Sequence, residues 1–192
     1  MSAARDRWLD EGLKVLGEDG AAGLRIDRIA ARLNLSKGSF HHHFDGAEGY
    51  KKELLARFER LSIETLETAI AEVGESADAR AVFAQLTKLI RPGSTALYYP
   101  RLDVALRAWA TWDPEVRAVQ SRLDEARLSA LQQVWRSVVD SDEEARTAAL
   151  LPYLLAVGAT VVFPPIAADQ LRGLYERLLP LVPDHPGDAR QG

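Results

Sequence analysis

The stretch "IDRIAARLNLSKGSFHHHF", residues 26–44, decides the fold of this chain. Its first half repeats apolar residues at helical spacing: Ile26, Ile29, Ala30 and Leu33. Asn34 then interrupts the repeat, and asparagine is one of the few residues that tolerates a left-handed backbone. Ser36 follows, a residue well suited to cap the start of a second helix. The stretch therefore predicts two helices joined by a tight turn.

The second of these helices, expected over residues 37–44, is two-faced. Phe40 and Phe44 lie four residues apart, so they share one face. At the angular spacing of a helix, Gly38 and His42 lie on the opposite face. We therefore expect the two phenylalanines to be buried, with Gly38 and His42 facing outward.

Three adjacent histidines raise the question of metal binding or catalysis. His41 and His43 point about 200° apart on a helix, so they do not grip one ion, which needs an i,i+4 pair. The chain has no cysteine. No Gly-x-Ser-x-Gly turn, Gly-rich phosphate loop or His-Glu-x-x-His motif occurs in the sequence. The sequence thus predicts no metal site, no cofactor and no enzymatic activity.

Nucleic-acid binding would account for every feature of the stretch. The net charge of the chain is −4, yet residues 25–44 hold four Lys and Arg against one Asp. On a helix that enters a major groove, Gly38 lets the backbone approach DNA closely. The side chains that then offer donors to base edges are Lys37, Ser39 and His42, and those that reach phosphates are Arg25, His41 and His43. From residue chemistry alone, a small solvated helix with a polar face remains the alternative.

The rest of the chain also has helical periodicity and almost no strand signal. Leu9, Leu13 and Leu16 predict a first helix before this stretch, and after the histidines the pattern predicts helices over residues 47–73, 79–90, 102–112, 115–139, 141–163 and 166–179. Ser141 with Glu144 reads as a capping box. The fold class expected is all-α, with about nine helices.

One uncharged run, residues 148–168, needs a membrane check. Pro164 ends any helix there after about 16 residues, or roughly 24 Å, which is shorter than the ~30 Å core of a bilayer. The N-terminus has no apolar signal segment. We therefore expect no membrane span and a cytoplasmic protein.

Residues 5–55 resemble the DNA-binding domain of the TetR family of bacterial one-component regulators. The residues that match the family pattern are Ile29-Ala30, Ser36-Lys37-Gly38-Ser39 and His43-Phe44. The chain departs from the pattern at Arg25, where a capping Thr is usual, at His41, where Tyr is usual, and at Ala47, where Lys is usual. Lys51 or Lys52 could replace the phosphate contact that Ala47 lacks.

The resemblance implies an N-terminal three-helix helix-turn-helix domain followed by a larger helical domain for effector binding and dimerisation. We expect the limits to be 1–46 for the DNA-binding domain, 47–75 for a connecting helix, 76–183 for the second domain and 184–192 for a flexible tail. The function implied is that of a homodimeric repressor, which a small, largely apolar effector releases from a double-stranded DNA operator. The alternatives are a ligand-binding helical protein with a weakened DNA reader, and a regulator whose ligand promotes DNA binding.

Two stretches of the second domain, "RAWATWDPEVRAVQSRLDEAR" and "DEEARTAALLPYLLAVGA", resemble a subgroup of TetR C-terminal domains. In that subgroup the last two long helices build a dimer interface, which implies a role for Leu155, Ala156, Gly158, Ala159 and Val162. The aromatic residues expected to line an effector site are Phe83, Tyr98, Tyr99, Trp109, Trp112 and Tyr153, with Trp135 a further candidate.

Overall fold

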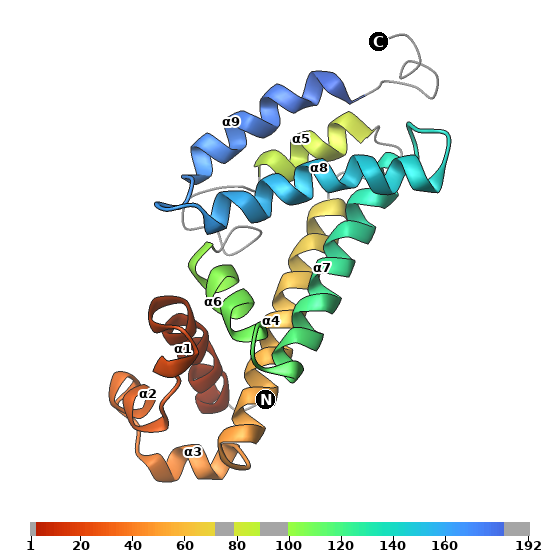
Figure 1. Cartoon of the computed structure of the whole chain (residues 1–192). Helices are drawn as coiled ribbons and strands as arrows, with labels where there is room; N and C mark the ends of the chain where they lie inside the picture. The colour runs from red at the N-terminus through yellow and green to blue at the C-terminus, as the bar shows by residue number, and fades with distance from the viewer. Residues whose placement is uncertain (1–2, 72–78, 89–99, 183–192) are drawn as a thin grey trace. The chain divides into compact units, whose positions relative to one another are not determined.

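The computed structural model describes residues 3–71, 79–88 and 100–182, and every regular element in these ranges is helical. The helices are shown in Figure 1 and run as follows: α1 Ala3–Asp19, α2 Ile26–Leu33, α3 Lys37–His43, α4 Gly46–Ala71, α5 Ala79–Lys88, α6 Pro100–Ala110, α7 Pro114–Trp135, α8 Asp142–Val161 and α9 Ala168–Leu178. Two short 3-10 turns, η1 Ala21–Gly23 and η2 Leu179–Leu181, complete them. The all-α prediction is confirmed.

The chain divides into two compact units. The first combines residues 1–61 with 101–122, and the second combines 62–100 with 123–192. The N-terminal helices thus share their unit with α6 and the start of α7, which lie far away in the sequence. The domain limits expected from the sequence assign each domain one continuous segment. They did not anticipate a unit made of two segments that are distant in the sequence. Those limits stay a prediction.

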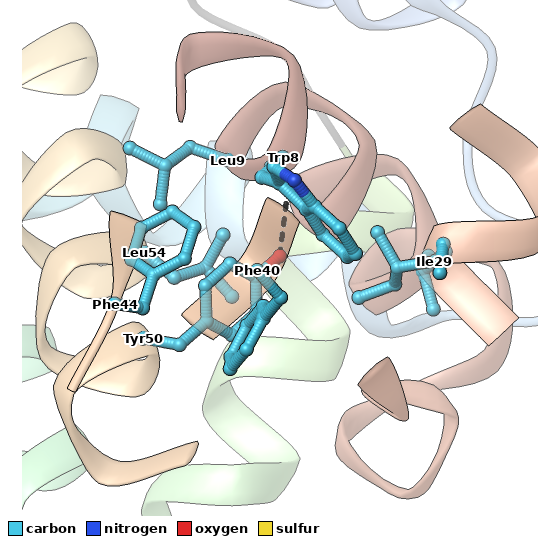
Figure 2. Packing of buried hydrophobic residues seen from close by; sticks show 9 residues of the cluster. Trp8, Leu9, Ile29, Phe40, Phe44, Tyr50 and Leu54 are labelled. Atoms are coloured by element: carbon cyan, nitrogen blue, oxygen red, sulfur yellow. Dashed lines mark hydrogen bonds between the residues drawn. The ribbon is translucent and has the colours of Figure 1, made fainter. Parts of the chain in front are cut away.

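An aromatic cluster forms the core of the first unit (Figure 2). Trp8, Phe40 and Phe44 are at most 4% exposed. The Trp8 and Phe40 rings meet edge to face with centroids 5.3 Å apart. Tyr50 joins the cluster from α4 and donates its hydroxyl to the Trp8 carbonyl at 2.8 Å, the dashed line in Figure 2. The predicted burial of both phenylalanines is confirmed.

The turn between α2 and α3 has the predicted geometry. Asn34 adopts the left-handed conformation, with φ of 53° and ψ of 45°. This ends α2 and lets the Leu35 amide donate back to the Ala30 carbonyl at 2.9 Å. Arg7 of α1 donates to the Leu33 carbonyl at 3.0 Å, which satisfies another acceptor at the end of α2.

In the second unit, α8 and α9 pack together through Ala159, Ala168 and Leu171. The Tyr175 hydroxyl of α9 donates to the Pro152 carbonyl of α8 at 2.5 Å. Pro152 lies inside α8 without ending it, and this bond ties its carbonyl to α9. The two helices therefore form one antiparallel pair with a shared apolar seam.

Two helix ends differ in detail from the sequence expectation. α7 ends at Trp135, four residues before the expected end, and the Ser137 hydroxyl donates back to the Val134 carbonyl at 2.8 Å. A serine hydroxyl that bonds its local backbone competes with helix continuation. At the start of α8, Ser141 accepts from the Glu144 amide at 3.2 Å as expected, but the Glu144 carboxylate accepts from the Asp140 amide.

Candidate nucleic-acid interface

α3 presents one polar face outward and anchors the other in the aromatic core. Ser36 caps its start, because the Ser36 hydroxyl accepts from the Ser39 amide at 3.3 Å. Phe40 lies inside the core and Phe44 closes the helix, its amide donating to the Phe40 carbonyl at 2.9 Å. The orientation of α3 about its own axis is therefore fixed by two aromatic side chains.

The outward face carries the residues that the sequence singled out. Lys37, Gly38, His41 and His42 are exposed, whereas Ser39 and His43 are half-buried at its edges. A Cβ placed on Gly38 would meet only the Ser36 hydroxyl, at an ordinary contact of 3.6 Å. Glycine at this position is therefore not required by packing within the protomer.

Ser39 makes a contact that sequence reasoning missed. The Trp8 indole nitrogen lies 3.5 Å from the Ser39 hydroxyl oxygen, across 31 positions of sequence. The indole can only donate, so the Ser39 oxygen is the acceptor and its hydrogen stays available to another group. No local signal predicts a contact over such a separation.

The arginines of α2 and its cap are paired with carboxylates. Arg28 contacts Asp19 at 2.8 Å, and Arg32 contacts Glu18 at 2.7 Å, both acids at the end of α1. Arg25 contacts Asp27 at 3.2 Å. Burial raises the pKa of Asp27, but the charge of Arg25 and the Arg28 amide outweigh it, so the pKa of Asp27 falls below its usual value.

These pairs reduce the cationic excess that the sequence count gives to residues 25–44. Lys37 is different, since no salt bridge to it occurs within the described part of the chain. The permanent positive charge on the outward face of α3 is therefore that of one lysine.

The surroundings of Lys51 differ from those of a lysine that is free to contact a phosphate. Its ammonium contacts Glu48 at 2.8 Å, Glu115 at 3.0 Å and Asp113 at 3.4 Å. Only 18% of its side chain is exposed. These carboxylates, Glu48 first, raise the pKa of Lys51 well above its ordinary value. The geometry argues against the phosphate contact expected for this residue.

The candidate effector residues fall into separate groups. Trp109 is buried and Trp112 is 66% exposed, with ring centroids 6.2 Å apart, and both belong to the first unit. Phe83 lies in a core cluster of the second unit, 5.2 Å from the Trp135 ring. Tyr153 is half-buried on α8. Tyr98 and Tyr99 lie outside the described residues.

The candidate interface residues of α8 differ in their exposure. Ala159 is buried against α9, so it faces the interior of its own unit. Val162 is exposed, and Leu155, Ala156 and Gly158 are half-buried. Sequence reasoning missed the most exposed apolar side chains of this region: Leu150, Leu151, Leu154, Val161, Phe163 and Leu174. The spacing of three, four and seven among Leu150, Leu151, Leu154 and Val161 along α8 was the available signal.

Two properties of the described residues bear on other functions. No group of three or more His, Cys, Asp or Glu side chains in that part of the chain is arranged to hold a metal ion. No helix there combines the length and the apolar character that crossing a bilayer requires.

Residues 9–56 match the sequence model of a family described as bacterial regulatory proteins, tetR family. The match covers α1 after its first turns, α2, α3 and the first part of α4. It therefore contains α2, α3 and three members of the aromatic core, Phe40, Phe44 and Tyr50, but not Trp8. A comparison with curated proteins gives no match.

Solved structures with the same fold extend over nearly the whole chain. A putative transcriptional regulator from Saccharomonospora viridis, in complex with choline, is 21% identical with a TM-score of 0.71, over 94% of this chain and 97% of that one. The reduced form of E. coli NemR is 17% identical with a TM-score of 0.76, over 94% and 98%. The multidrug binding protein EbrR, in complex with imidazole, is 20% identical with a TM-score of 0.61, over 93% and 96%. At these identities the likeness establishes the fold.

Proposed function

This chain belongs to the TetR family of bacterial regulatory proteins and is a DNA-binding transcriptional regulator, and from that premise we propose that it is a homodimeric repressor. A small, largely apolar effector releases it from a double-stranded operator. The observation that carries the proposal is the outward face of α3, where Lys37, Gly38 and His42 lie exposed while Phe40 and Phe44 are buried.

The contacts proposed for α3 follow from exposure and chemistry. Lys37, Ser39 and His42 offer donors to base edges, and a lysine favours the N7 and O6 atoms of guanine. His41 and His43 flank them, and Arg25 lies exposed at the cap of α2, so these side chains reach phosphates at the groove rim. Ser36 contributes by fixing the start of the helix. Phosphate contacts hold the position, whereas base contacts select the sequence.

A second copy of the chain is the proposed occupant of the apolar face of α8 and α9. Leu151, Leu154 and Val161 of α8 are about half exposed, and Leu174 of α9 is 44% exposed. A Cβ on Gly158 would meet nothing within 4 Å, so the helix offers a place for close approach of another backbone. Burying such a surface stabilises an assembly by ~25 cal/mol per Å² of apolar area.

A dimer also matches the repeat of the DNA double helix. Paired recognition helices read half-sites one helical turn apart, about 34–36 Å, in successive major grooves. A dimer of this chain would then prefer an operator with two related half-sites.

The proposed effector site draws on a buried polar atom of the second unit. The indole nitrogen of Trp135, whose ring centroid lies 5.2 Å from that of Phe83, is buried and has no hydrogen-bond partner among the described residues. A buried donor without a partner is costly, and a ligand acceptor would satisfy it. Likeness to proteins solved with choline and with imidazole supports a small organic ligand. A largely apolar molecule with an acceptor group fits this donor.

A weakened DNA reader is the second candidate, and one observation favours it. The arginines of α2 are held by acids of α1, and Lys51 is held by three carboxylates. Few cations of these helices then remain for phosphates. This candidate predicts weak, salt-sensitive binding without sequence preference.

Selection of duplexes from a random pool by the full-length chain separates these candidates. The proposal predicts enrichment of one sequence with two half-sites and a gel shift that salt weakens steeply. Absence of enrichment would favour the weakened reader. Adding apolar compounds that carry one acceptor to the bound complex then distinguishes a ligand that releases DNA from one that promotes binding.

A further inference from the structure

Lys51 lies at the meeting of α4 with the turn between α6 and α7. All the partners of its ammonium belong to the first unit: Glu48 one turn back on α4, and Asp113 and Glu115 from the turn. One ammonium against three carboxylates leaves this cluster with a net negative charge. A DNA phosphate that approached Lys51 would be repelled by the same carboxylates.

Asp113 contacts Lys51 in this cluster and also caps the start of a helix. Its Oδ1 accepts from the Glu115 amide at 3.0 Å and from the Val116 amide at 3.3 Å, so it caps the start of α7. Its Oδ2 accepts from Lys51. Burial raises the pKa of Asp113, but the two amides and Lys51 together lower it below its usual value.

The turn that holds Lys51 is itself braced from α7. The Arg117 guanidinium donates to the Ala110 carbonyl at 2.9 Å and to the Thr111 carbonyl at 2.8 Å. These bonds satisfy acceptors at the end of α6. The end of α6, the start of α7 and the Lys51 ammonium are therefore joined by charge-assisted hydrogen bonds, which are the stronger kind.

We propose that Lys51 is a positioning residue for DNA binding: it fastens the start of α4, and with it α3, to the α6–α7 turn, and it does not contact DNA. α3 ends at His43 and α4 begins at Gly46, so only two residues separate them. Holding the first turns of α4 therefore limits how α3 tilts. The inference rests on the proposed DNA-binding role of α3.

The experiment measures the affinity of folded full-length variants for a labelled duplex that the wild-type protein selected from a random pool. Lys51→Met is compared with Lys14→Met, which removes a lysine charge from an exposed position of α1 and should leave the affinity unchanged. We expect Lys51→Met to weaken binding roughly 2- to 30-fold, the range of couplings carried by positioning residues. The dependence of log affinity on log salt stays unchanged, because no phosphate contact is lost.

The sign of the Asp113→Asn effect separates positioning from simple electrostatics. Asparagine still caps α7, but it removes the charge that holds Lys51. Losing an acid should strengthen DNA binding if Lys51 acts on DNA through its charge. If Lys51 acts by positioning, Asp113→Asn should instead weaken DNA binding, as Lys51→Met does. The double variant should then bind DNA no more weakly than either single variant. Lys51→Arg, which keeps the charge, should restore affinity.

Three results would overturn the inference. They are a salt slope in Lys51→Met that falls by about one, tighter binding by Asp113→Asn, or an affinity in Lys51→Met equal to that of the wild type. Thermal unfolding of each variant shows that affinity is compared between folded proteins. If the wild-type chain selects no duplex at all, the proposed function fails, a result distinct from these three.

Discussion

Gly38 is the residue at which helix stability and the proposed interface have opposite requirements. Glycine disfavours a helix relative to alanine by up to ~1 kcal/mol. Within the protomer a Cβ has room there, since its closest neighbour is the Ser36 hydroxyl at 3.6 Å. The absence of a side chain is explained if another backbone or a DNA strand approaches the helix at this point.

Gly38→Ala is therefore expected to raise or leave unchanged the melting temperature while weakening operator binding by ~1–3 kcal/mol, the scale of one lost base contact. Thermal unfolding and a gel shift on the same sample measure the two quantities. Equal affinity of the variant and the wild type would show that α3 does not approach DNA through this face.

Local residue chemistry allowed the predictions of the Ser36 cap, the left-handed Asn34 and the two buried phenylalanines. Each of these follows from residues within a few positions. The Trp8 contact to Ser39 could not be predicted, because it joins residues 31 positions apart. The partners of Lys51 at Asp113 and Glu115 were missed for the same reason.

At the scale of elements, α1 and α4 pack at a point where only glycine fits. A Cβ on Gly12 would overlap the Tyr50 hydroxyl and press on Leu54. That hydroxyl is committed to the Trp8 carbonyl at 2.8 Å. The helical pattern predicted both helices, but it gave no reason to expect a glycine to set their separation.

Gly12→Ala should lower the free energy of unfolding by ~1–3 kcal/mol, the usual cost of overpacking a core. Tyr50→Phe alone should cost ~1 kcal/mol through the lost hydrogen bond. Because the phenylalanine removes the overlapping oxygen, the double variant should lose less than the sum of the two. Urea unfolding of the four proteins gives this coupling, and strict additivity would mean that the two residues do not meet.

At the scale of the molecule, two long helices, α4 and α7, each run from one compact unit into the other. The sequence predicted both helices, but it could not show that residues 101–122 share a unit with the N-terminal helices. The resemblance to a family subgroup also implied that α8 is an interface helix, which its uncharged character suits, and this stays a prediction. Which side of α8 faces outward depends on its packing against α9, so Ala159 proved to be buried there.

Gly158→Glu tests the proposed dimer. Within the protomer a Cβ at this position meets nothing within 4 Å, so the fold of the single chain should tolerate the change. In a dimer seam the unpaired charge would cost several kcal/mol, and the variant should be a monomer. Light scattering measures the mass, with Ala118→Glu, at an exposed position of α7, as the control. A stable dimer of Gly158→Glu would exclude this seam.

The central claim, that the outward face of α3 reads DNA, is tested most directly by the base preference of Lys37→Ala on the duplex that the wild-type chain selects. Lys37 is exposed at the start of α3, and loss of a base contact should cost ~1–3 kcal/mol and abolish discrimination at one base position in each half-site. An unchanged preference at every position, with unchanged affinity, would contradict the account.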